Sequence, residues 1–176
     1  DMLRGWNNDM LVLCGYNHTR TSLNAHIRAL RDIENPEPTT GDVVVCLRNS
    51  RTDHLYNGQI GTIMSIEPSP DDPNNEWYWA DIYFDSEKSR YSGYVLREQF
   101  GAKETIKQPP KAPGDSTGAL FDFGYALTVH KAQGSQAKQV LLFEERFSKM
   151  SDEEWRRWLY TGVTRAEERL TIVGLP

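Results

Sequence analysis

Three residues with phosphate-binding side chains, Thr128, His130 and Lys131, lie directly after an alternating apolar run. A hydroxyl, an imidazole and an ammonium group can each donate a hydrogen bond to a phosphate oxygen. Gly134 and Gln136 follow, and a glycine lets the backbone approach a ligand closely. A capping threonine beside a surface histidine would explain the same residues without a ligand, so this segment alone leaves both interpretations open.

A second candidate is Arg165, which follows residues 160–164 at the end of a predicted helix. An arginine at a helix end is usually a solvated charge that interacts favourably with the helix dipole. The run before it is unusually small and polar for a helix that begins with two tryptophans. An arginine held there can instead reach the terminal phosphate of a nucleotide across a cleft, as an arginine finger does.

The elements around these residues predict a parallel α/β domain. Apolar runs typical of strands in a sheet occupy residues 10–14, 121–127, 139–143 and 170–174. In such sheets ligands bind beyond the carboxyl ends of the strands. Residues 128–136 begin at such an end, so their polar groups are expected to face a ligand.

Two helices are predicted between these strands. Residues 15–20 have the composition of a loop, after which Thr21 or Ser22 caps the first helix. Ser151 and Glu154 have the spacing of a capping box, which begins the second helix.

A series of short strands without helices interrupts this pattern. Between residues 41 and 108 four strands at roughly ten-residue spacing predict a small β-barrel or roll. This region has 7 Lys and Arg against 11 Asp and Glu, a charge of −4, and is therefore a poor candidate for phosphate binding. The proline-rich residues 105–118 are interpreted as a linker back to the α/β pattern.

Composition limits the class of protein further. The 176 residues are 38% hydrophobic and carry a charge of −5, so nucleic-acid binding requires a local patch. Cys14 and Cys46 lie in apolar runs, which predicts buried thiols and a reducing, cytoplasmic compartment. No apolar run approaches about 20 residues, so no membrane span is expected. The remaining histidines show no metal-ligand spacing and receive no metal role; they are His18, His26 and His54.

Three segments, in this order along the chain, resemble motifs of superfamily 1 helicases. Tyr16-Asn-His-Thr-Arg20 is similar to motif IV, ALTVHKAQGSQ at residues 126–136 to motif V, and YTGVTRAEERL at residues 160–170 to motif VI. Their order and the β insert resemble the RecD/Dda-like, UvrD-related branch. The resemblance implies a RecA-like (P-loop NTPase-type) parallel sheet domain interrupted by a small SH3-like β-barrel insert.

The resemblance also implies a role for each matching residue at a nucleotide. Arg165 would be the catalytic arginine finger on the γ-phosphate of ATP, and Arg20 a second phosphate contact. Gly134 and Gln136 would lie near the ribose and the phosphates. UvrD-branch relatives carry a glutamate where this chain has Gln136, which leaves its ribose contact open.

For single-stranded DNA, the resemblance implies that Thr128 and His130 contact the strand backbone. Lys131 is a weaker candidate, for which a solvated surface position is an equal alternative. Asn17 would shape the motif IV loop.

The implied domain bounds are residues 1–38 and 109–176 for the RecA-like domain and 39–108 for the insert. The sequence contains no G-x-x-x-x-G-K-[ST] loop and no Asp-Glu pair after a strand to hold Mg²⁺. These parts are expected on an N-terminal RecA-like domain of the same protein. Because the chain starts at Asp1 without an initiator methionine, we expect a fragment of a longer protein. The resemblance implies the C-terminal part of an ATP-dependent helicase that moves 5′ to 3′, and this part is not expected to hydrolyse ATP alone.

Other functions stay open at this point. A non-catalytic module would bind DNA or a protein through the β insert. A parent protein fused to a nuclease or relaxase is a weaker alternative that no residue addresses. Candidate partners besides single-stranded DNA are replication or repair proteins.

Overall fold

The structure is a computed structural model that describes residues 2–174. The chain divides into two compact units. The first comprises Asp1–Glu34 and Tyr125–Pro176, and the second comprises Asn35–Gly124. Because the second unit is inserted within the first, the interruption expected from the sequence is present, with different bounds.

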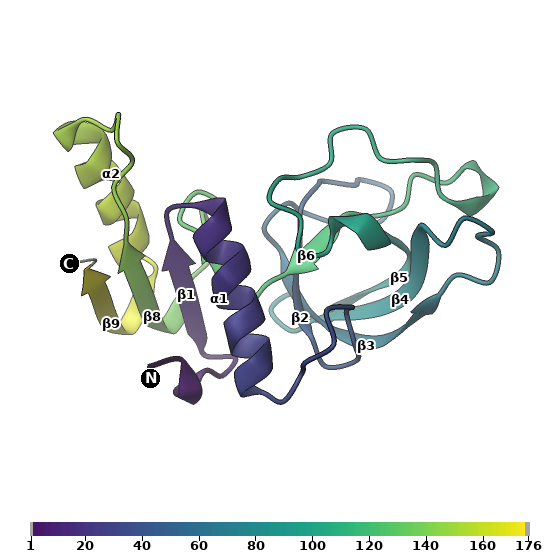
Figure 1. Cartoon of the computed structure of the whole chain (residues 1–176), viewed down its shortest axis with the longest axis horizontal. Helices are drawn as coiled ribbons and strands as arrows, with labels where there is room; N and C mark the ends of the chain where they lie inside the picture. The colour runs from purple at the N-terminus through teal and green to yellow at the C-terminus, as the bar shows by residue number, and fades with distance from the viewer. Residues whose placement is uncertain (1, 175–176) are drawn as a thin grey trace. The chain divides into compact units, whose positions relative to one another are not determined.

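The first unit is built on a parallel sheet in the order β7-β1-β8-β9 (Figure 1). The strands are β1 (Met10–Cys14), β7 (Ala126–Thr128), β8 (Ala137–Glu144) and β9 (Ala166–Gly174). β1 lies in the middle of the sheet, and Val12, Leu13 and Cys14 are completely buried. Its continuous apolar sequence is therefore that of a strand covered on both faces.

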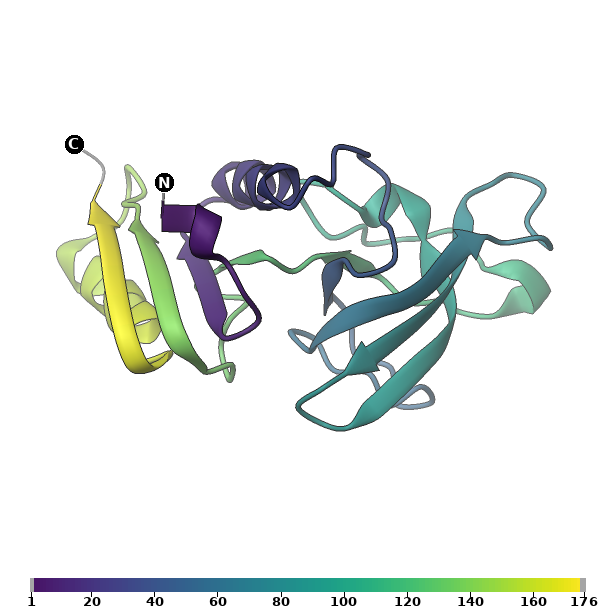
Figure 2. The same cartoon turned by 90° about the horizontal axis from the view of Figure 1, so that it is seen from below.

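Two helices pack on this sheet, α1 (Asn17–Leu30) and α2 (Asp152–Val163), and a short 3-10 helix, η1 (Met2–Gly5), precedes β1. α1 follows β1 and α2 connects β8 to β9, and Figure 2 shows the two helices on opposite sides of the sheet. The connection from β1 leads to β7 on one side of the sheet and that from β8 leads to β9 on the other. Two right-handed crossovers toward opposite sides place their helices on opposite faces of a parallel sheet. No helix of the described residues is long and apolar enough to cross a membrane.

The second unit is an antiparallel sheet in the order β5-β4-β3-β2-β6. The strands are β2 (Val43–Cys46), β3 (Ile60–Pro68), β4 (Trp77–Phe84), β5 (Ser89–Leu96) and β6 (Phe121–Phe123); η2 (Arg97–Gln99) and η3 (Pro113–Asp115) are short 3-10 helices. Its core contains Val44, Ile82, Phe84 and Phe121, all at most 1% exposed. An all-β insert was predicted, and its assignment as SH3-like stays a prediction.

The capping box at the start of α2 is confirmed. The Ser151 hydroxyl accepts from the Glu154 backbone N–H at 3.2 Å, and the Glu154 carboxylate accepts from the Ser151 N–H at 2.8 Å. The predicted start of α1 is wrong, because the helix begins at Asn17 and not after Thr21. Its N-cap residue, Tyr16, makes no side-chain cap bond, and the cap comes from elsewhere in the chain.

A single strand over residues 121–127 was also predicted wrongly. The run divides into β6, which pairs with β2, and β7, which pairs with β1. Gly124 lies between them, where a Cβ atom would be 2.8 Å from the Val44 carbonyl carbon. Because β6 pairs with β2, residues 109–124 lie in the second unit, and its bounds differ from the predicted 39–108.

Candidate functional site

The predicted site residues lie at the two opposite ends of the parallel strands. The carboxyl ends of the strands form the carboxyl edge of the sheet, and the amino ends form its amino edge. Leu13 is level with Leu127 and Leu142, so the carboxyl ends of β1, β7 and β8 meet at one edge. Ala137 is level with Ala166 at the amino ends of β8 and β9. At a rise of about 3.3 Å per residue, the five residues from Ala137 to Leu142 separate these levels by roughly 16 Å. In Figure 1, α1 begins beside the arrowheads, and the connection from α2 to β9 lies at the other edge.

The motif IV residues lie at the carboxyl edge, in the first turns of α1. Asn17 is exposed, whereas Arg20 is only 7% exposed. The Arg20 Nε donates to the Asn17 Oδ1 at 3.4 Å, so Asn17 helps to orient the guanidinium. The structure thus brings Arg20 together with Asn17 and not with Arg165, and its predicted phosphate contact stays a prediction.

Glu145 organises this turn and was not identified from the sequence. It directly follows β8 and is 6% exposed. Its Oε2 accepts from the backbone N–H groups of Gly15 at 2.6 Å and Tyr16 at 2.9 Å, and its Oε1 accepts from the Thr19 hydroxyl. A carboxylate at this place also interacts favourably with the positive end of the α1 dipole. Glu145 is therefore the missing cap of the helix, supplied from about 130 residues away in the chain.

Two neighbours show how closely Glu145 is packed. A Cβ on Gly15 would lie 3.0 Å from the Glu145 Cβ, so a larger residue would force the Glu145 side chain to shift. Burial raises the pKa of the Cys14 thiol to about 12, and the negative charge of Glu145 adds to this effect while Arg20 opposes it. The thiol therefore stays protonated at physiological pH.

The motif V segment begins at the same edge. Thr128 is 7% exposed, and its carbonyl accepts from the Lys131 and Ala132 N–H groups at 2.9 and 3.1 Å, which turns the chain out of β7. His130 is exposed and Lys131 half-buried. Of the three predicted DNA contacts, His130 is thus the one whose side chain the structure presents most openly.

A buried amide holds α1 and β7 together. Asn24 is 2% exposed; its Nδ2 donates to the Ala126 carbonyl at 3.1 Å and its Oδ1 accepts from the Ala126 N–H at 2.9 Å. The helix that carries motif IV is therefore fixed in register with the strand that carries motif V.

Arg165 lies at the amino edge, between α2 and β9. Its guanidinium donates to the Thr161 carbonyl at 3.0 Å, to the Ser135 carbonyl at 3.4 Å and to the Thr164 hydroxyl at 3.1 Å. The Arg165 carbonyl accepts from the Ala137 N–H at 3.0 Å. Motifs V and VI therefore meet at this edge. An arginine has five N–H donors, so two remain available within the described residues.

Gly134 and Gln136 flank the Ser135 carbonyl that Arg165 contacts. Gly134 has a φ of +89°, a backbone conformation that favours glycine, and no atom lies within 4 Å of the place of a Cβ. Gln136 is exposed. The predicted nucleotide contacts Gly134, Gln136 and Arg165 are thus neighbours with open surroundings, which fits a phosphate-bearing ligand. Among residues 2–174, no group of three or more His, Cys, Asp or Glu is arranged to hold a metal ion.

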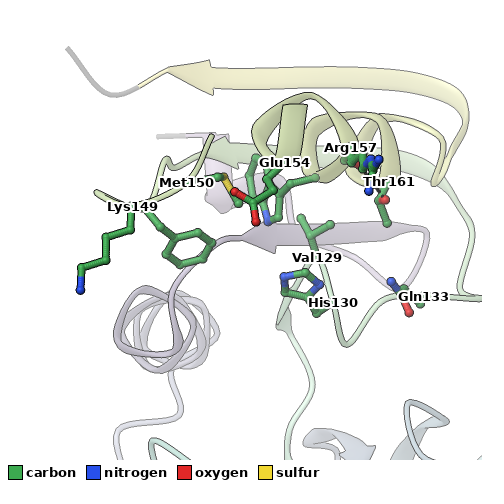
Figure 3. Close-up of a pocket in the computed structure, with 10 residues that line it drawn as sticks. Val129, His130, Gln133, Lys149, Met150, Glu154, Arg157 and Thr161 are labelled. Atoms are coloured by element: carbon green, nitrogen blue, oxygen red, sulfur yellow. Dashed lines mark hydrogen bonds between the residues drawn. The ribbon is translucent and has the colours of Figure 1, made fainter. Parts of the chain in front are cut away.

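A pocket of about 510 Å³ lies between α2 and the turn after β7. Figure 3 shows His130 and Gln133 on one side of it, with Glu154, Arg157 and Thr161 of α2 on the other. His130, a predicted DNA contact, thus also lines this pocket. Neither the pocket nor Glu145 has a signal in the sequence, because their parts come from segments that are far apart along the chain.

Comparison with known proteins places these motifs in a family. Residues 123–173, which include motifs V and VI, match the UvrD-like helicase C-terminal domain family. Over 86% of its length the chain is 28% identical to the "ATP-dependent RecD2 DNA helicase" of Deinococcus radiodurans. Residues 123–173 therefore belong to a UvrD-like helicase C-terminal domain, and the chain as a whole is similar to RecD-type helicases. The chain is also 35% identical, over 47% of its length, to the "RecBCD enzyme subunit RecD" of Mycobacterium tuberculosis.

The chain spans 18% of the length of the RecD2 relative and 14% of that of the RecD relative. Among solved structures, it is similar to the Bacteroides Pif1 helicase in complex with ADP-AlF3 and single-stranded DNA, with a TM-score of 0.58 at 15% identity over 98% of this chain and 41% of that one. The Candida albicans Pif1 helicase gives 0.59 at 12% identity over 98% and 46%. These similarities show the fold, and they fit the predicted RecA-like domain.

Proposed function

We propose that the chain is the C-terminal part of an ATP-dependent DNA helicase, in which it supplies one wall of the ATP site and part of the single-stranded DNA track. The observation that carries the proposal is the contact of Arg165 with the Ser135 carbonyl at one edge of the sheet, while His130 is exposed near the other. Residues 128–136 join the two edges. A short segment that serves both ligands is what coupling of ATP hydrolysis to movement requires.

At the amino edge Arg165 acts as the arginine finger. Negative charge on the γ-phosphate is stabilised in the transition state by a guanidinium that is already oriented. The Thr161 and Ser135 carbonyls hold this guanidinium, and its two remaining N–H groups are directed to the phosphate. Gly134 admits the ligand close to the backbone, and the Gln136 amide contacts the ribose or phosphates. Mg²⁺ arrives with ATP and is held by carboxylates of an N-terminal RecA-like domain.

Near the carboxyl edge His130 contacts the phosphates of single-stranded DNA, with Lys131 and Thr128 beside it. The first unit contains 12 Lys and Arg against 11 Asp and Glu, a charge of +1, whereas the second has 8 against 14, a charge of −6. This asymmetry favours the first unit as the part that binds DNA. By the family resemblance, the parent protein moves 5′ to 3′ in the cytoplasm and works with replication or repair proteins.

The direct test is ATP turnover of the full-length protein that carries this chain. Arg165→Ala is expected to lower DNA-stimulated turnover by about 10³-fold or more, because loss of an arginine finger has effects of that size. Arg165→Lys, which keeps the charge without the planar fork, is the matched control and should recover only a small part. Turnover that persists in Arg165→Ala would rule out this role.

The alternative is a non-catalytic module that binds a partner through the insert. Its exposed apolar side chains, among them Trp79 at 39% and Met64 at 50%, favour a protein partner, since the charge of −6 disfavours DNA. The residues encoded upstream of Asp1 distinguish between the helicase and the non-catalytic module. A phosphate-binding loop with an Asp-Glu pair would support the helicase, and an open reading frame that starts here would support the module.

A further inference from the structure

We propose that the pocket between α2 and the turn after β7 receives a nucleobase of the bound DNA strand. The inference rests on the proposed function, because it assumes that the strand passes His130. The pocket, at about 510 Å³, falls within the range of about 300–1,000 Å³ that is usual for small-ligand sites. It therefore has room for one base with its sugar.

On the α2 side of the pocket the Arg157 guanidinium is paired with Glu153, so the charge that decides between a base and a phosphate is that of Glu154. The Glu154 carboxylate borders the pocket, and hydrogen bonds from the Ser151 N–H and hydroxyl lower the pKa of Glu154. A permanent negative charge repels a phosphate but accepts hydrogen bonds from the amino and imino groups of a neutral base. Phosphates stay at the rim, where His130 and Lys149 lie.

The inner wall is apolar and suits the face of a heterocycle. Val129 is completely buried and Trp158 is 3% exposed, while Phe147 and Met150 are half-buried. Phe147 and Met150 have exposed surface on which a base can stack with little regard to sequence. At the rim, His130, Gln133 and Lys149 form no hydrogen bond within the described residues, so their polar groups are available to a ligand.

The wall that follows β8 is held in place before any ligand binds. The Phe147 ring packs edge-on against Tyr16 with centroids 4.4 Å apart, and the Tyr16 hydroxyl donates to the Arg146 carbonyl at 3.2 Å. The Arg146 guanidinium donates to the Met150 carbonyl at 3.2 Å. Because Glu145 fixes Tyr16, the pocket wall is tied to the carboxyl edge of the sheet. Such preorganisation reduces the cost of ordering the site on binding.

The test compares two ligands that share their phosphates. Affinities of the 176-residue chain are measured at low salt for a 12-nucleotide oligothymidine and for an abasic strand of equal length. We expect the bases to improve the affinity roughly tenfold, the scale of one stacked base. Thr161→Phe, which fills the pocket from α2, should reduce the affinity for oligothymidine to that for the abasic strand. Thr161→Val, which keeps the pocket, should retain the difference.

The outcomes separate this inference from the proposed function. The inference would be overturned if the unsubstituted chain bound both strands with equal affinity, or if Thr161→Phe still bound oligothymidine more tightly than the abasic strand. Either result would leave the proposed DNA-binding function unaffected. If the unsubstituted chain binds neither strand, the result would instead contradict the proposed function. The Met150 methyl NMR signal supplies a second readout that does not depend on the variant. A shift with a tryptophan-containing dipeptide and none with oligothymidine would show a protein-binding pocket and also overturn the inference.

Discussion

The two edges of the parallel sheet differ in how their polar groups are used. At the carboxyl edge, Glu145, Arg20, Asn24 and Thr128 are at most 7% exposed, and the carboxylate of Glu145 and the amide of Asn24 are bonded to the surrounding backbone. At the amino edge, Arg165 is half-exposed and keeps two N–H groups available. Substitutions at the first edge should therefore reduce stability, and those at the second should reduce activity while leaving the fold intact.

The largest effect on stability is expected from Glu145→Ala. Two backbone N–H groups and the Thr19 hydroxyl lose a buried acceptor, so the free energy of unfolding should fall by about 3 kcal/mol. Urea denaturation of Glu145→Ala, Glu145→Gln and Arg165→Ala checks this, and Glu145→Gln should be intermediate because an amide oxygen still accepts. If Arg165→Ala lowers the free energy of unfolding as much as Glu145→Ala does, the two edges do not differ in their contribution to stability.

Gly15→Ala should have the next largest effect. The added methyl group would lie 3.0 Å from the Glu145 Cβ, and such overpacking costs about 1–3 kcal/mol. Gly5→Ala is the matched control, since no atom lies within 4 Å of the place of its Cβ. Equal midpoints for the two variants in thermal unfolding would show that the turn tolerates a side chain.

Removal of the α2 cap should have a smaller effect. Ser151→Ala should reduce stability by about 1 kcal/mol and should raise the pKa of Glu154 part of the way towards 4.5, because the hydroxyl hydrogen bond is lost while the backbone N–H bond, the larger cause of the lowered pKa, remains. The contribution of a carboxylate with a lowered pKa is present above pH 4.5 and is lost as the pH falls through the lowered value. NMR titration of Glu154 measures this, and an unchanged pKa would be the contrary result.

The reactivity of the Cys14 thiol should show, without any substitution, whether the carboxyl edge stays closed to solvent. With a pKa of about 12 and complete burial, it should not react with a thiol reagent at pH 8 until the chain unfolds. Mass spectrometry of the labelled peptide gives the rate. Labelling of Cys14 in the folded chain would show that this edge opens.

The sequence predicted those structural features that depend on interactions between residues close together in the chain. The capping box, the buried β1 and the inserted β strands were correctly predicted, because each depends on residues close together in the chain. The start of α1 was missed because its cap, Glu145, lies beyond the insert, and the break at Gly124 was missed because alternation continues across it. The roles assigned to the candidate site residues stay predictions, and the contact between motifs V and VI appears only in the structure. The position of Arg20 away from Arg165 required the strand register.

The most direct test of the two-edge account measures both ligands in the same two variants of the full-length protein. For Arg165→Ala we predict ATP turnover reduced by about 10³-fold, with the affinity for single-stranded DNA changed by no more than about twofold. For His130→Ala we predict weaker DNA binding with ATP turnover largely retained, because a hydrogen bond to one phosphate is lost. Equal loss of ATP turnover and DNA affinity in both variants would contradict the account.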